Sequence, residues 1–94
     1  MTISFTKSLH PGIAAGVIDC SVRIWKYQRV KVGARAPLGL GHVEVTAVTE
    51  IPRSKITNKL ARRSGFKDVE DLMKVAQHGS GDRVFLVEFV YEDG

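Results

Sequence analysis

The sequence predicts one α+β domain, residues 1–94, built on a curled, barrel-like β-sheet of about five to six strands with two to three short helices. Ninety-four residues suffice for one hydrophobic core and not for two. Hydrophobic residues make up 44% and charged residues 26% of the chain, which is typical of a globular protein. Strand-like and helix-like periodicity follow one another in the order β-α-β-β-β-α-α-β, with no repeat or linker between them.

The first part of the chain predicts a short strand, a short helix and a second strand. Residues 3–5 alternate apolar and polar, and a helix through residues 13–15 is expected to end at Gly16, because glycine readily adopts the positive φ of a helix C-cap. Residues 20–25 alternate again, which predicts a strand with two distinct faces. One face carries Cys20, Val22 and Ile24, and the other carries Ser21, Arg23 and Trp25.

The middle of the chain predicts two further strands. A turn at Gly33 leads to a strand over residues 36–40, and Pro37 makes that strand an edge or a bulged one, because proline cannot donate a ladder hydrogen bond. Residues 42–51 form the clearest strand, with odd-numbered residues on one face and even-numbered residues on the other throughout. Pro52 is expected to end it.

Two helices and a central strand are predicted in the last part of the chain. Ser54 is expected to cap a helix that Gly65 closes, and Asp68 to cap a second helix with apolar residues at helical spacing over residues 69–76. Residues 84–91 are apolar on nearly both faces, as in a central strand of a curled sheet.

The segment at residues 13–23 resembles the signature of ASCH domains, a PUA-like family whose motif runs Gly-x-Lys-x-x-Glu-x-Arg. Gly16 and Arg23 match that motif, whereas Ile18 stands at the lysine and Ser21 at the glutamate. Further segments are similar to the family in order and spacing, with Gly33 in the turn that enters the next barrel strand. The resemblance implies a PUA-like barrel of the small bacterial or phage type.

Some small members of this family hydrolyse N4-acetylcytidine with a lysine, a threonine and a glutamate. The resemblance implies that Ser21 is the only counterpart here, because Ile18 replaces the lysine and residues 62–65 contain no acid. A serine hydroxyl needs a neighbouring base to become a nucleophile, and no spacing selects a histidine for that task. The sequence therefore leans against an enzyme, with Ser21 as a weak catalytic candidate.

Charge is strongly separated along the chain. Residues 21–67 contain eleven lysines and arginines and two glutamates, whereas residues 68–94 contain two basic and seven acidic residues. Such a separation steers anions toward the basic part and is expected for a nucleic-acid-binding protein. A solvated basic surface without a ligand is the alternative.

Arg23 is the leading candidate for binding, because its guanidinium can donate two parallel hydrogen bonds to a phosphate or a base edge. A cross-strand ion pair with Glu44 or Glu50 is the alternative. Trp25 and Tyr27 lie among basic residues, a combination that holds single-stranded nucleic acid by stacking. Packing of Trp25 over the mouth of the barrel is the competing interpretation.

The helix expected after Pro52 carries basic residues at intervals of three and four, which puts Lys55, Lys59 and Arg62 or Arg63 on one face. Phosphates could follow that face with salt-dependent affinity, although a merely solvated face is the alternative. The complete set of predicted nucleic-acid-binding residues is Arg23, Ser21, Trp25, Lys26, Arg29, Lys55, Lys59, Arg62 and Arg63.

Three function hypotheses follow. The first is a PUA-like module that binds RNA or a modified nucleotide in a basic cleft. The second is a small hydrolase, an N4-acetylcytidine amidohydrolase or a ribonuclease, and the third is an adaptor for an acidic protein. The loss of the motif lysine favours the first over the second, and charge alone does not separate the first from the third.

Metal, cofactor and membrane partners are not expected. The three histidines are scattered, Cys20 is the only cysteine, and no paired metal-ligand or phosphate-loop motif occurs. A single cysteine and the lack of a leader or a long apolar segment predict a cytoplasmic protein. The oligomeric state stays open.

Overall fold

The computed structural model describes residues 5, 7–76 and 81–93 and has the predicted α+β architecture. Three short α-helices agree with the prediction, whereas the sheet has four strands in the described part of the chain and not five or six. The strand predicted at residues 3–5 lies, except for Phe5, outside the described residues. The elements are η1 (Lys7–Leu9), α1 (His10–Ala14), β1 (Cys20–Trp25), β2 (Arg35–Leu38), β3 (Gly41–Ile51), η2 (Arg53–Lys55), α2 (Asn58–Arg63), α3 (Val69–Ala76) and β4 (Arg83–Glu92), where η denotes a 3₁₀ turn.

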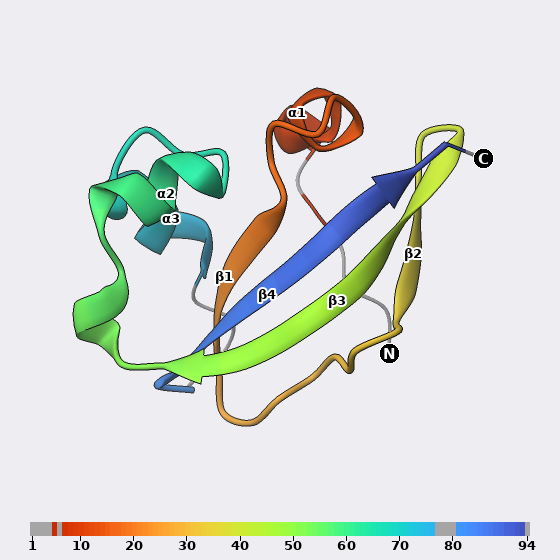
Figure 1. The fold of residues 1–94 in the computed structure, drawn as a ribbon. Helices are drawn as coiled ribbons and strands as arrows, with labels where there is room; N and C mark the ends of the chain where they lie inside the picture. Colours follow the sequence, from red (N-terminus) through yellow and green to blue (C-terminus); the bar gives the residue numbers. More distant parts are fainter. Residues whose placement is uncertain (1–4, 6, 77–80, 94) are drawn as a thin grey trace.

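The four strands form one antiparallel sheet in the order β1-β4-β3-β2, curled into a half-barrel (Figure 1). β4 lies inside the sheet between β1 and β3, which confirms the prediction of a central strand. Its alternating residues enter two separate clusters, because Phe85 and Phe89 pack in an inner core while Val84 packs in an outer one. Burial on both faces explains why this segment lacks the simple apolar and polar alternation of a surface strand.

β3 contains a bulge that changes which of its residues share a face. Val45 pairs with Phe89 and Ala47 pairs with Glu88, so Thr46 is the additional residue. A bulge shifts the alternation by one position. The prediction of a single alternation through residues 42–51 is therefore wrong beyond Val45, and Ile51 belongs to the outer cluster.

Two predicted turn glycines adopt conformations that favour glycine. Gly16 follows α1 with a φ of 78°, and Gly33 has a φ of 91° while its N–H donates to the carbonyl of Val45 at 2.7 Å. β2 is an edge strand on which Pro37 is exposed, as expected from the missing N–H. β3 ends at Ile51, one residue before the proline that was expected to stop it.

The first residue of α2 differs from the prediction. Thr57, and not Ser54, is the N-cap, and its hydroxyl accepts a hydrogen bond from the Leu60 N–H at 3.2 Å. Ser54 lies instead in η2, and the extended backbone at Ile56 separates that turn from the helix. Gly65 closes α2 as predicted, because it follows the C-cap Ser64 with a φ of 97°.

The N-terminus of α3 is capped by carboxylates, as predicted from Asp68. The Asp68 carboxylate accepts from the Asp71 N–H at 2.9 Å, and the Asp71 carboxylate accepts from the Lys67 N–H at 3.2 Å. Acidic side chains at this position also complement the positive end of the helix dipole.

The helices cover different parts of the curled sheet (Figure 1). α2 and α3 lie side by side and bury Ala61 and Leu72 against the outer cluster, while α1 buries Ile13 in the inner core. None of the helices in the described ranges is long and apolar enough to cross a membrane.

Replacing the α2 N-cap tests this assignment. We expect Thr57→Ala to lower the free energy of unfolding by about 1 kcal/mol, because the Leu60 N–H loses its partner. Ser54→Ala is the matched control, and its effect is expected to be much smaller. Urea unfolding followed by circular dichroism measures both, and a larger loss for Ser54→Ala would contradict the assignment.

Candidate functional site

Three predicted binding residues, Ser21, Arg23 and Trp25, lie on β1 and point toward the inner face of the half-barrel. The Nε of Arg23 donates to the hydroxyl of Ser21 at 2.7 Å, which places these two side chains together. Trp25 joins the inner core, where its ring centroid lies 5.6 Å from that of Phe85. The grouping expected from the strand period is thus present, inside the curl of the sheet.

The Arg23 guanidinium is largely withdrawn from solvent and lies beside an aromatic ring. Its central carbon is 5.3 Å from the centroid of the Phe5 ring, a cation–π geometry. Burial lowers the pKa of Arg23 to about 10, so the side chain still carries its proton at neutral pH. Arg23 therefore brings a positive charge into the inner face.

Among the described residues, the contact of Ser21 with Arg23 does not activate Ser21 as a nucleophile. Its hydroxyl accepts from Arg23, a protonated group that cannot remove the serine proton. His10 is engaged elsewhere, with its Nε2 3.2 Å from the carbonyl of Phe5, and His42 lies beside Glu92. His78, the third histidine, lies outside the described residues.

The two aromatic side chains that lie among basic residues at the end of β1 and just after it, Trp25 and Tyr27, differ in their exposure to solvent. Trp25 is 5% exposed, whereas Tyr27 is 59% exposed and lies under the guanidinium of Arg29, whose carbon is 5.8 Å from the ring centroid. The packing interpretation thus describes Trp25, and Tyr27 is the ring that solvent and a ligand can reach. Lys26, between them in the chain, is exposed as well.

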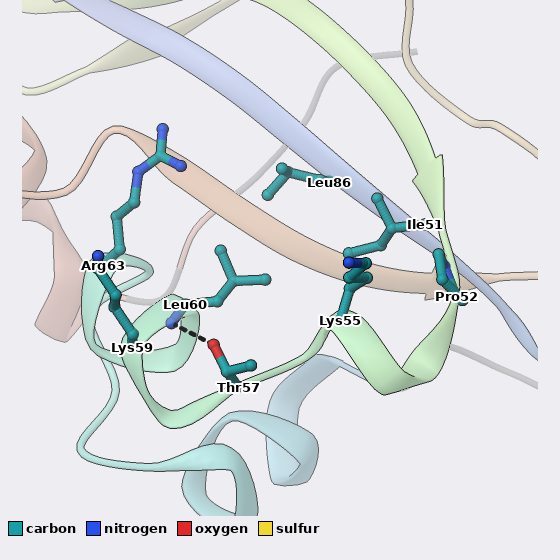
Figure 2. A pocket seen from close by; sticks show the side chains of 8 residues that line it. All are labelled: Ile51, Pro52, Lys55, Thr57, Lys59, Leu60, Arg63 and Leu86. Atoms are coloured by element: carbon teal, nitrogen blue, oxygen red, sulfur yellow. Dashed lines mark hydrogen bonds between the residues drawn. The ribbon is translucent and has the colours of Figure 1, made fainter.

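The predicted basic helix face becomes one wall of a pocket between η2, α2 and the outer face of the sheet (Figure 2). This η2–α2 pocket has a volume of about 410 Å³. Leu60, Leu86 and Ile51 face its interior, with Lys59 and Arg63 toward one end and Lys55 toward the other. Its lining residues are Ile51, Pro52, Lys55, Thr57, Lys59, Leu60, Arg63 and Leu86.

Of the two candidate arginines of α2, Arg63 lines the pocket and Arg62 does not. The Nε of Arg63 donates to Asp19 at 2.9 Å and its second nitrogen donates to Glu88 at 3.0 Å. These hydrogen bonds, first to Glu88 and then to Asp19, raise the pKa of Arg63. The side chain is thereby held in place, and its charge is partly balanced before any ligand arrives.

Two other arginines pair across strands with the glutamates considered for Arg23. Arg35 donates to Glu44 at 3.1 Å, and Arg83 donates to both oxygens of Glu50, at 2.8 and 3.1 Å. The hydrogen bonds from Arg83 lower the pKa of the Glu50 carboxyl. Arg83 also donates to the Lys26 carbonyl at 3.5 Å, so the basic segment after β1 begins at the end of the sheet where β4 starts.

The apolar residues of the η2–α2 pocket were not foreseen from the sequence. Unbroken alternation in β3 would have turned Ile51 toward the inner face, and the bulge at Thr46 turns it outward. From the sequence, Leu86 was expected only to be part of a buried central strand, and not to line a pocket. The spacing of Lys55 and Lys59 could be recognised in the sequence. The apolar residues between them in the pocket could not, because their position depends on the register of the sheet.

Comparison with protein-family models, curated proteins and solved structures finds no match.

The single tryptophan reports on its burial. We expect native Trp25 to fluoresce at shorter wavelength than the unfolded chain and to be poorly quenched by acrylamide, because its ring packs in the inner core. Saturation with single-stranded RNA is expected to leave this emission nearly unchanged. The control corrects the emission for light that the added RNA itself absorbs. Strong quenching by RNA would instead show stacking on Trp25.

Proposed function

We propose that this chain is a PUA-like module of the ASCH type that binds RNA or a nucleotide through the η2–α2 pocket. The observation that carries the proposal is the apolar floor of Ile51, Leu60 and Leu86 with a lysine toward each end. A nucleotide combines the same two properties, a flat and largely apolar base face and anionic phosphates. The resemblance at Gly16 and Arg23 supports the family part of the proposal.

The size of the η2–α2 pocket suits one nucleotide better than a duplex. A volume of about 410 Å³ falls in the range of about 300–1,000 Å³ of small-ligand pockets. The hydroxyl oxygen of Thr57, a polar group that lines the pocket, already accepts a hydrogen bond from the Leu60 N–H and is therefore engaged in capping the helix. With aliphatic side chains forming the floor, the base is held mainly by contact area, so a single-stranded and sequence-tolerant ligand fits best.

The two lysines are the proposed phosphate contacts. Arg63 is paired with Asp19 and Glu88, which leaves Lys55 and Lys59 to supply most of the attraction at the pocket. Both lysines are exposed, so their ammonium groups reach solvent and an incoming phosphate. Contacts of this kind give affinity that decreases with salt.

The exposed segment after β1 offers a second contact for a longer RNA. Ile51 of the pocket pairs with Val84, the residue next to Arg83, and Arg83 contacts the carbonyl of Lys26. Tyr27 with Arg29 over its ring then provides an accessible platform for a neighbouring base. In this proposal Ser21, Arg23 and Trp25 shape the inner face and have no direct ligand contact assigned to them.

Removing both pocket lysines tests the proposal. We expect Lys55→Ala/Lys59→Ala to weaken binding of a single-stranded RNA by about tenfold, or about 1.4 kcal/mol. The dependence of log affinity on log salt should also become less steep by about 1.4, because each phosphate contact to a single strand contributes about 0.7. Fluorescence anisotropy with labelled RNA across a salt series measures both quantities.

A charge-matched control separates the pocket from the overall charge. Lys67→Ala/Lys74→Ala removes the same charge from residues that do not line the pocket. Equal losses in both double variants would contradict a pocket site. Binding of an acidic peptide but not of RNA, sensitive to the same two lysines, would favour the adaptor alternative.

The hydrolase alternative gains nothing from the contacts of Ser21. We expect no release of acetate from N4-acetylcytidine above the background rate, and no effect of Ser21→Ala, because the hydroxyl accepts from a protonated arginine. Chromatography of the nucleoside after incubation measures this, with heat-denatured protein as the control. Turnover that Ser21→Ala abolishes would restore the hydrolase.

A further inference from the structure

Three metal-ligating side chains meet on the outer face of the sheet at the end remote from the η2–α2 pocket. His42 and Glu92 are cross-strand partners on β3 and β4, and Glu44 follows His42 by two residues on the same face. One potential ligand atom from each of the three lies within 4.8 Å of the other two. Strand pairing therefore brings together residues that are fifty positions apart in the sequence.

The imidazole of His42 lacks a hydrogen bond where it faces this cluster. Its Nε2 is screened from solvent and has no hydrogen-bond partner among the described residues. The nearest carboxylate oxygen, Oε2 of Glu92, is 3.7 Å away, beyond hydrogen-bonding distance. Buried polar atoms nearly always have a partner, so this ring nitrogen beside two carboxylates is available to bind a cation.

We propose that His42, Glu44 and Glu92 bind a divalent transition metal ion of the zinc class. An imidazole nitrogen with two carboxylate oxygens is a ligand set that Zn²⁺ accepts in tetrahedral geometry, with a solvent molecule in the fourth position. Mg²⁺ and Ca²⁺ prefer oxygen ligands throughout and are disfavoured by the imidazole. This site is separate from the proposed RNA site and does not depend on it.

The surroundings of the cluster suit a metal ion. Arg35 donates to Oε1 of Glu44, an outer contact of the kind that fixes the orientation of a ligating carboxylate. The Glu92 side chain is 52% exposed at the end of β4, so it is able to move the short distance that closes the ligand set. Two carboxylates against one arginine leave the site with negative charge.

Zinc binding to the full chain tests the proposal. Calorimetric titration with zinc chloride, in a buffer that does not bind zinc, is expected to give one bound ion per chain, and Mg²⁺ is expected to give no heat of binding. In NMR spectra, the ring signals of His42 should shift on addition of Zn²⁺. His42→Ala and, independently, Glu92→Gln should each weaken zinc binding by tenfold or more.

His10→Ala is the matched control, because His10 is also half-buried but contacts a backbone carbonyl and lies outside the cluster. It should leave zinc binding unchanged. Glu92→Gln changes a residue at the end of a strand, so this variant is expected to have the same melting temperature as the wild type. It therefore still tests the site if His42→Ala proves to be unfolded. Absence of zinc binding, or binding that both cluster variants leave intact, would overturn the proposal.

Discussion

The burial of β4 on both of its faces is the constraint on which the rest of this structure depends. Phe85 and Phe89 anchor the inner core while Val84 anchors the outer one, and each buried side chain of this kind contributes about 1.5–3 kcal/mol. Because β4 also pairs along both edges, its register fixes the positions of β1 and β3 together. The η2–α2 pocket at one end of β4 and the His42–Glu44–Glu92 cluster at the other end both follow from that register.

The features that could be predicted are those encoded within a few neighbouring residues. The period of two in β1, the doubly apolar pattern of β4 and the φ-permissive glycines at 16 and 65 led to the observed elements. The start of α2 was missed because Ser54 and Thr57 are both good N-caps, and the choice depends on the extended backbone at Ile56, which local propensity does not reveal. The fifth or sixth strand is not present in the described part of the chain.

The candidate site was only partly predictable, because it depends on contacts between distant segments. The bulge at Thr46 gives no signal in the alternation, yet it decides that Ile51 faces Leu60 across the pocket. The partners of Arg63 are 44 and 25 residues away. The His42–Glu44–Glu92 cluster follows no local motif, because His42 and Glu44 share a face through the strand period and meet Glu92 across strands.

The η2–α2 pocket and the His42–Glu44–Glu92 cluster lie at opposite ends of the β3–β4 pair. β3 and β4 are antiparallel, so Val84 lies beside Ile51 at the pocket end and Glu92 lies beside His42 at the end that holds the cluster. Val84 and Glu92 are eight positions apart on β4, roughly 27 Å of extended strand, which is about three times the Debye length of about 8 Å at physiological salt. An anion at the pocket and a cation at the carboxylates would therefore interact little through solvent. The same two strands can therefore carry two ligand sites of opposite preference that act independently.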